Sequence, residues 1–230
     1  MVHLYAALLQ IPGMDSAELT TQEQLSQAWD GMGIMRWPLI FCLGLGIIVI
    51  IIKFISLTII ASKSKKLLKE VDELLVQRQI KEALSLTRDT NSPAANVLYA
   101  GLERHEEGTE RVMKAIENQG LLEMSKLEKG LVLLATLTNI APLLGFLGTV
   151  IGMIIAFQSI ELAGEVEATL VAGGIKVALL TTAAGLCIAI PVSVSHNYFV
   201  AKIDGLVIDM EESAQKMVDT LHAIETGRAG

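Results

Sequence analysis

The chain has 230 residues, of which 52% are hydrophobic and only 19% are charged, with a formal net charge of −7. A soluble domain of this size usually carries about 25% charged residues. The apolar residues gather in three long blocks, which indicates membrane spans rather than an enriched core. The negative charge argues against nucleic acid as a partner, because contacts to phosphate need clustered Lys and Arg.

No nucleophile, nucleotide-loop or metal-ligand motif occurs in the sequence. Cys42 and Cys187 lie inside apolar blocks, where cysteine acts as a small apolar residue. The four histidines are scattered without the spacing of metal ligands. We therefore expect no enzyme activity, no cofactor and no metal site.

Residues 1–36 precede the first apolar block and are predicted to be a periplasmic segment. Their apolar run, residues 2–11, is short and has no basic residue before it, so it does not resemble a signal peptide. The first span is predicted at residues 37–61, long enough for about 30 Å of hydrocarbon. Trp37 and Pro38 suit an interface and a helix start. Lys53 interrupts the block, and we expect its ammonium to reach the headgroups.

Residues 62–130 are predicted to form a cytoplasmic helical domain. Apolar residues recur at helical spacing between residues 63 and 90, which predicts a helix there. Ser92 and Pro93 mark the start of a second helix, and a third begins at Thr109. Nothing interrupts the pattern of this third helix before the second span, so we predict that the two form one long helix.

The C-terminal segment, residues 196–230, is predicted to be a cytoplasmic helix. Its apolar residues alternate spacings of four and three: Ile203, Val207, Met210, Ala214, Met217, Leu221 and Ile224. Such a seam must be covered by another helix. The covering helix belongs either to the same chain or to a second subunit, and both can hold in a ring.

The second and third spans are predicted at residues 131–157 and 171–195, joined by a periplasmic loop, residues 158–170. This loop holds three glutamates and no basic residue. The polar segments on the other side of the membrane, residues 62–130 and 196–230, carry Lys63, Lys65, Lys66, Lys69, Lys126, Lys129 and Lys202. The positive-inside rule then predicts a multi-pass membrane protein with its N-terminus outside and residues 62–130 and its C-terminus on the cytoplasmic side.

Small residues form one stripe on each of these two spans. The stripe of the second span contains Ala141, Gly145, Gly148, Gly152 and Ala156, with Thr149 inside it, and that of the third contains Gly174, Ala178, Gly185 and Ala189, with Thr181 and Thr182. Either the stripes pack helices closely together, or they line one shared ion path to which the three threonines offer hydroxyls. A threonine in a membrane helix also commonly bonds a carbonyl of its own helix.

Neither span contains a carboxylate, so this chain on its own lacks the titrating group that a proton relay within the membrane needs. Lys176 is the ionisable residue of the third span and lies roughly opposite its stripe by helical angle. We expect it to reach the headgroups or to pair with a glutamate of the neighbouring loop, Glu161, Glu165 or Glu167.

Two stretches resemble the MotA/TolQ/ExbB proton-channel family: LEKGLVLLATLTNIAPLLGFLGTVIGMIIAF at residues 127–157 and GGIKVALLTTAAGLCIAIPVSVSHNYF at residues 173–199. Three spans with a long loop before the second match ExbB and TolQ rather than four-span MotA. The resemblance implies an all-α membrane protein that forms a ring, a pentamer, around a single-span partner of the ExbD/TolR type. It further implies that a membrane aspartate of this partner carries the proton.

The resemblance also implies that Thr149 and Thr182 are the pore-facing threonines. Val177 stands where ExbB proteins commonly carry a glutamate. The additional hydroxyl at Thr181 resembles sodium-driven stators, so both H⁺ and Na⁺ remain candidates for the transported ion. The implied function is a motor subunit that conducts ions across the inner membrane and energises a periplasmic or outer-membrane process such as transport. The alternative from another class is a structural membrane scaffold, an oligomer without ion conduction.

Overall fold

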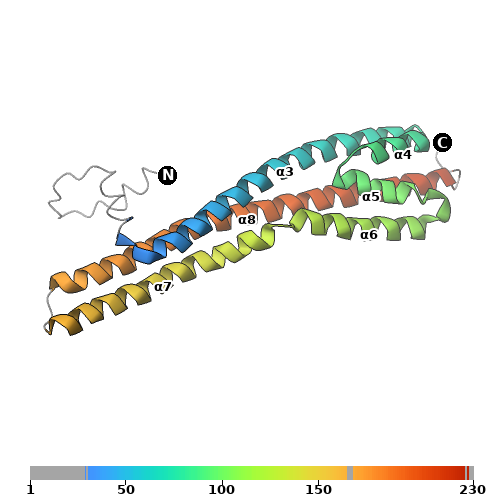
Figure 1. The fold of residues 1–230 in the computed structure, drawn as a ribbon. Coiled ribbons are helices and arrows are strands. Elements are labelled where there is room, and N and C mark those ends of the chain that lie inside the picture. The colour runs from blue at the N-terminus through green and yellow to red at the C-terminus, as the bar shows by residue number, and fades with distance from the viewer. Residues whose placement is uncertain (1–28, 30, 165–167, 226, 228–230) are drawn as a thin grey trace. The chain divides into compact units, whose positions relative to one another are not determined.

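The computed structural model describes residues 29, 31–164, 168–225 and 227, and every regular element within them is a helix. In chain order these are η1 (Gly33–Met35), α3 (Arg36–Val76), α4 (Ile80–Asp89), α5 (Pro93–Leu102), η2 (His105–Glu107), α6 (Thr109–Glu128), α7 (Leu131–Ala163) and α8 (Ala168–Glu225) (Figure 1). Three helical stretches are long and apolar enough to cross a membrane. The predicted all-α fold with three candidate spans is therefore confirmed.

The three stretches differ in the share of their most apolar segment that is buried against the rest of the chain. That share is 17% in the stretch containing α3, 28% in the one containing α7 and 33% in the one containing α8. On α3, Ile48, Ile52 and Ile55 are more than half exposed. A helical segment that is apolar all round needs an apolar surrounding, so the exposed surface of the apolar part of α3 suits lipid.

The prediction of one continuous helix from Thr109 into the second span is wrong. Helix α6 ends at Glu128 and α7 begins at Leu131, because Lys129 leaves the helical region and Gly130 has φ +89°. Glycine adopts positive φ at little cost since it has no Cβ. Leu127 and Leu131 are both buried on either side of the break, so the apolar pattern continues through an interrupted backbone.

Residues 63–90 are likewise not one helix. Helix α3 extends from the first span to Val76, Arg78 turns the chain at φ +62°, and α4 follows. The predicted starts of the next two helices are confirmed. Ser92 caps α5 by accepting a 3.2 Å hydrogen bond from the Ala95 N–H, with Pro93 in the first turn, and α6 begins at Thr109.

The chain divides into two compact units, which we describe separately. Of the described residues, the first unit comprises residues 29, 31–45, 137–164 and 168–191, and the second comprises residues 46–136, 192–225 and 227. In the second unit the apolar seam of α8 is covered by the chain's own helices. Five of its members are at most 6% exposed: Ile203, Met210, Ala214, Met217 and Leu221.

Close packing holds this second unit together. A Cβ added to Gly101 of α5 would lie 2.5 Å from Met217 Cε of α8 and 2.9 Å from Ile116 Cδ1 of α6. Three helices therefore meet at one glycine, and their side chains interdigitate as protein interiors do. Packing within the chain, one of the two coverings predicted for the seam, is therefore present.

Candidate functional site

The small-residue stripes of α7 and α8 face each other in the first unit. Cβ atoms added to Gly152 and Gly185 would each lie 2.6 Å from a backbone carbonyl oxygen of the opposite helix, that of Gly174 and that of Ala141. The stripe alanines Ala141, Ala156, Ala178 and Ala189 are at most 6% exposed. Glycine is needed here because the two backbones touch, and the centre of the contact leaves no room for a path between the helices.

Thr181 lies in the centre of this contact. It is fully buried and packs directly on Gly148, where an added Cβ would overlap its side chain. Its Oγ1 is 2.9 Å from the Val177 carbonyl oxygen and 3.0 Å from that of Ala178, so its proton is used within its own helix. The structure therefore places Thr181 as a packing residue, away from any surface that a partner could reach.

Thr149 and Thr182 lie at the rim of the contact, and both are half-buried. Thr149 Oγ1 donates to the Phe146 carbonyl at 2.6 Å. Thr182 Oγ1 is 3.2 Å from the Ala178 carbonyl oxygen and 3.3 Å from that of Gly145, across the contact. A hydroxyl that donates its proton keeps acceptor capacity, so each threonine still offers an oxygen lone pair to a neighbour.

The two rim threonines lie on the same side of the contact. Residues 145, 148 and 152 of α7 meet residues of falling number on α8, so the helices are antiparallel. Thr149 follows Gly148, and Thr182 follows Thr181, each turned by about 100° from a residue at the centre. Because the helices are antiparallel, one rotation is clockwise and the other anticlockwise when both helices are viewed from the same end. The two central residues face each other, so these opposite rotations bring Thr149 and Thr182 to the same side of the helix pair. Together they form one hydroxyl-bearing edge.

Lys176 is exposed, and its stem lies beside Gly31, where an added Cβ would be 3.5 Å from Lys176 Cε. The predicted pairing with Glu165 or Glu167 falls outside the described residues. Val177, where the resemblance leads us to expect a glutamate, is half-buried and offers its carbonyl to Thr181. No group of three or more His, Cys, Asp or Glu suited to a metal occurs among the residues the structure describes.

Sequence reasoning missed a buried carboxylate in the second unit. The Glu123 side chain is 4% exposed, and its Oε1 accepts from Asn96 Nδ2 at 3.0 Å, Gln119 Nε2 at 3.0 Å and Lys126 Nζ at 2.7 Å. The bond from Asn96 joins α5 to α6. The sequence signal that could have revealed its burial is helical spacing, because Glu123 lies on the same helical face as buried Leu127 one turn later.

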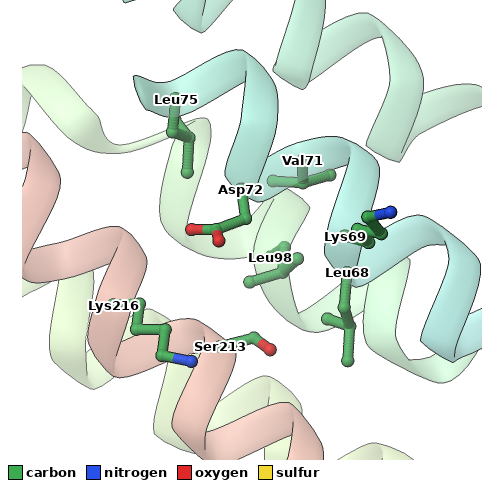
Figure 2. Close-up of a pocket in the computed structure, with 8 residues that line it drawn as sticks. All are labelled: Leu68, Lys69, Val71, Asp72, Leu75, Leu98, Ser213 and Lys216. Carbon is green, nitrogen blue, oxygen red and sulfur yellow. The ribbon is translucent and has the colours of Figure 1, made fainter. Parts of the chain in front are cut away.

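A cavity of about 150 Å³ opens between α3, α5 and α8 in the same unit. Figure 2 shows the Asp72 carboxylate on one wall and Ser213 and Lys216 on the facing wall, with apolar side chains such as Leu98 between them. Lys216 Nζ is 2.7 Å from Glu212 Oε1. This hydrogen bond raises the pKa of Lys216, and Asp72 adds a smaller contribution in the same direction.

Comparison with known proteins places this geometry in context. The sequence pattern of the MotA/TolQ/ExbB proton channel family matches residues 89–212, which include both rim threonines. The chain is 32% identical over 154 residues to a biopolymer transport ExbB homolog of Methanothermobacter thermautotrophicus, covering 67% of this chain and 54% of that protein. It is 30% identical over 174 residues to biopolymer transport protein exbB1 of Vibrio cholerae, covering 74% and 76%.

A third relative is the Tol-Pal system protein TolQ of Haemophilus influenzae, 32% identical over 122 residues, with 53% of this chain and 52% of that protein covered. The chain thus spans about half the length of the Methanothermobacter and Haemophilus proteins and about three quarters of the Vibrio protein. In all three cases the similarity is to proteins named ExbB or TolQ.

Proposed function

Because this chain belongs to the MotA/TolQ/ExbB proton channel family, we propose that it is an ExbB/TolQ-like subunit of an ion-driven motor. With a single-span partner of the ExbD/TolR type it conducts protons, or Na⁺, across the bacterial inner membrane. The ion flow energises a periplasmic or outer-membrane process such as transport. In this assignment the N-terminus is periplasmic, and the helices of residues 62–130 and 196–230 extend into the cytoplasm.

The observation that carries the proposal is the hydroxyl-bearing edge formed by Thr149 and Thr182. Both side chains are half-buried at one rim of an otherwise apolar helix contact. A partner helix that docks along this edge meets two oxygens able to accept a hydrogen bond or to coordinate a cation. Since residues 131–157 and 171–195 contain no carboxylate, the titrating aspartate is supplied by the partner.

An exposed face of α8 supports assembly into a homo-oligomer, for which the family resemblance implies a pentamer. Tyr198 and Ile208 are 53% and 61% exposed in the second unit, and Ala201 and Gly205 lie exposed between them at helical spacing. Two small residues four apart, flanked by large apolar ones, suit the close approach of another helix. A second copy of the chain covers this face in the proposed ring.

The alternative function is a structural scaffold, and the tight contact of the α7 and α8 stripes favours it, because the small residues are used for packing. The two functions are separated by ion flux. We expect liposomes that hold this chain together with its ExbD/TolR-type partner to pass protons or Na⁺ down an imposed gradient. Replacing the partner's membrane aspartate with asparagine should abolish that flux. A stable complex that passes no ion with the native partner would establish the scaffold instead.

A further inference from the structure

Lys53 of α3 contacts the end of another helix in the second unit. Its side chain is half-buried, and Nζ donates to the carbonyl oxygen of Leu127, in the last turn of α6, at 2.8 Å. The sequence predicts that this ammonium reaches the headgroups, and the structure adds that it binds a backbone carbonyl 74 residues away in the sequence. Lys53 also lies outside the segment that matches the family pattern, residues 89–212.

The Leu127 carbonyl needs a donor because the helix is interrupted there. The last carbonyls of a helix lack the N–H partners that a continuing helix would supply, and α6 stops at Glu128. Leu127 and Leu131 are only 5% and 6% exposed, so the local surroundings are shielded from water. An unpaired carbonyl in such surroundings is costly, and a cation suits the negative end of the helix dipole.

Gly130 contributes to the same contact in two ways. Its φ of +89° breaks the helix and so leaves the carbonyl unpaired. A Cβ at this residue would lie in van der Waals contact with Lys53 Cε, at 3.4 Å, so the lysine stem packs directly beside Gly130. The helix break at Gly130 and the lysine that donates to the Leu127 carbonyl therefore come from two distant parts of the sequence and meet at one place.

We propose that Lys53 is a positioning residue that holds the C-terminal end of α6 against α3 and thereby fixes where α7 begins. Helix α7 carries Thr149, so the contact sets the starting point of the helix on which the proposed ion edge depends. The inference itself concerns the folded chain and does not require that the chain conducts ions. Its test can therefore succeed or fail independently of the proposed function.

The test is hydrogen exchange, followed by mass spectrometry, on the full chain in lipid nanodiscs. Lys53→Met keeps the aliphatic stem and removes the donor and charge, so the end of α6 should fray. We expect the amides of residues 124–129 to exchange about tenfold faster or more, since a charge-assisted hydrogen bond is lost. Lys53→Arg keeps a cationic donor and should restore exchange to within about threefold of the native rate.

Lys63→Met is the matched control, because Lys63 is an exposed lysine of the same helix, and it should leave these amides unchanged. If Lys53→Met does not accumulate in the membrane, Lys53→Gln gives the same comparison with a neutral donor and should exchange faster than Lys53→Arg. Native exchange in Lys53→Met or Lys53→Gln would overturn the proposal. The proposal would also be overturned if Lys63→Met accelerated exchange at residues 124–129 equally. It would be overturned as well if these amides exchanged as fast in Lys53→Arg as in the methionine or glutamine variant.

Discussion

Thr181 of α8 packs on Gly148 of α7 so closely that the glycine has no room for a methyl group. The threonine is fully buried, and both carbonyls within reach of its hydroxyl belong to its own helix. This relationship separates the three threonines of the sequence pattern. Thr181 belongs to the packing of the helix pair, whereas Thr149 and Thr182 remain at the rim, where another chain can reach them.

Gly148→Ala tests this packing directly. The new Cβ would overlap Thr181, so the helices must move apart, and we expect the stability of the folded chain to fall by about 1–3 kcal/mol. The measurement is thermal unfolding of the purified protein in detergent. Gly173→Ala is the control, since that helical glycine has nothing within 4 Å of an added Cβ. It should be neutral or stabilising, because alanine favours helices. Equal loss in both variants would refute the close contact.

Glu123→Leu should destabilise the second unit. The substitution removes the acceptor of three donors and leaves the Asn96 amide with no carboxylate to bind. Losing such a partner costs about 1–3 kcal/mol. We expect a lower midpoint in chemical unfolding and faster hydrogen exchange in α5. Glu117→Leu, at an exposed position of the same helix, is the control, and a loss there as large as at Glu123 would show that the buried network is unimportant.

The Glu212–Lys216 pair gives a prediction about pH. These residues lie beyond the predicted third span, and the hydrogen bond from Lys216 lowers the pKa of Glu212. A depressed carboxyl pKa adds stability above the ordinary pKa of Glu, and this is lost as pH falls through the lowered value. Because both side chains are well exposed, the effect on stability is small.

Carboxyl NMR should therefore show Glu212 titrating below an ordinary glutamate, and Lys216→Gln should return its pKa towards the ordinary value. A Glu212 pKa that is the same with and without Lys216 would contradict the pairing.

Gly205→Leu tests the exposed face of α8. An added Cβ meets nothing within 4 Å in the chain, so the folded subunit should tolerate leucine. A second copy packed closely on this face would not tolerate it. We expect native mass spectrometry to show loss of the homo-oligomer while circular dichroism stays native. Gly120→Leu on α6, also in open space, is the control. An intact oligomer in Gly205→Leu would exclude this face as a subunit contact.

Much of the fold could be predicted because its signals are local. Long apolar blocks predict candidate spans, and Ser92 with Pro93 predicts the start of α5. The breaks at Arg78 and Gly130 were missed because buried apolar residues continue on both sides of each, so periodicity alone does not reveal a turned backbone. The contacts of Glu123 and Lys53 join separate helices. Only the packing of those helices shows which donors and carbonyls meet.

The candidate site was predictable in its residues and less so in their arrangement. Helical spacing in the sequence identified the small-residue stripes and the three threonines within them. Sequence alone could not decide whether the stripes face each other, because helical angle places residues on a face without stating what that face touches. The contact between Gly148 and Thr181 makes that distinction and leaves Thr149 and Thr182 as the residues on which we propose that ion conduction depends.

The most direct test of that claim is ion flux through the double variant Thr149→Val and Thr182→Val, reconstituted with the partner in liposomes. Valine keeps the branched shape of threonine and removes only the hydroxyl. Thr58→Val is the control, because Thr58 Oγ1 makes the same kind of bond to its own helix, at the Phe54 carbonyl. We expect the double variant to assemble normally and to lose at least nine tenths of the partner-dependent flux, with the control unchanged. Native flux through an assembled double variant would contradict the account.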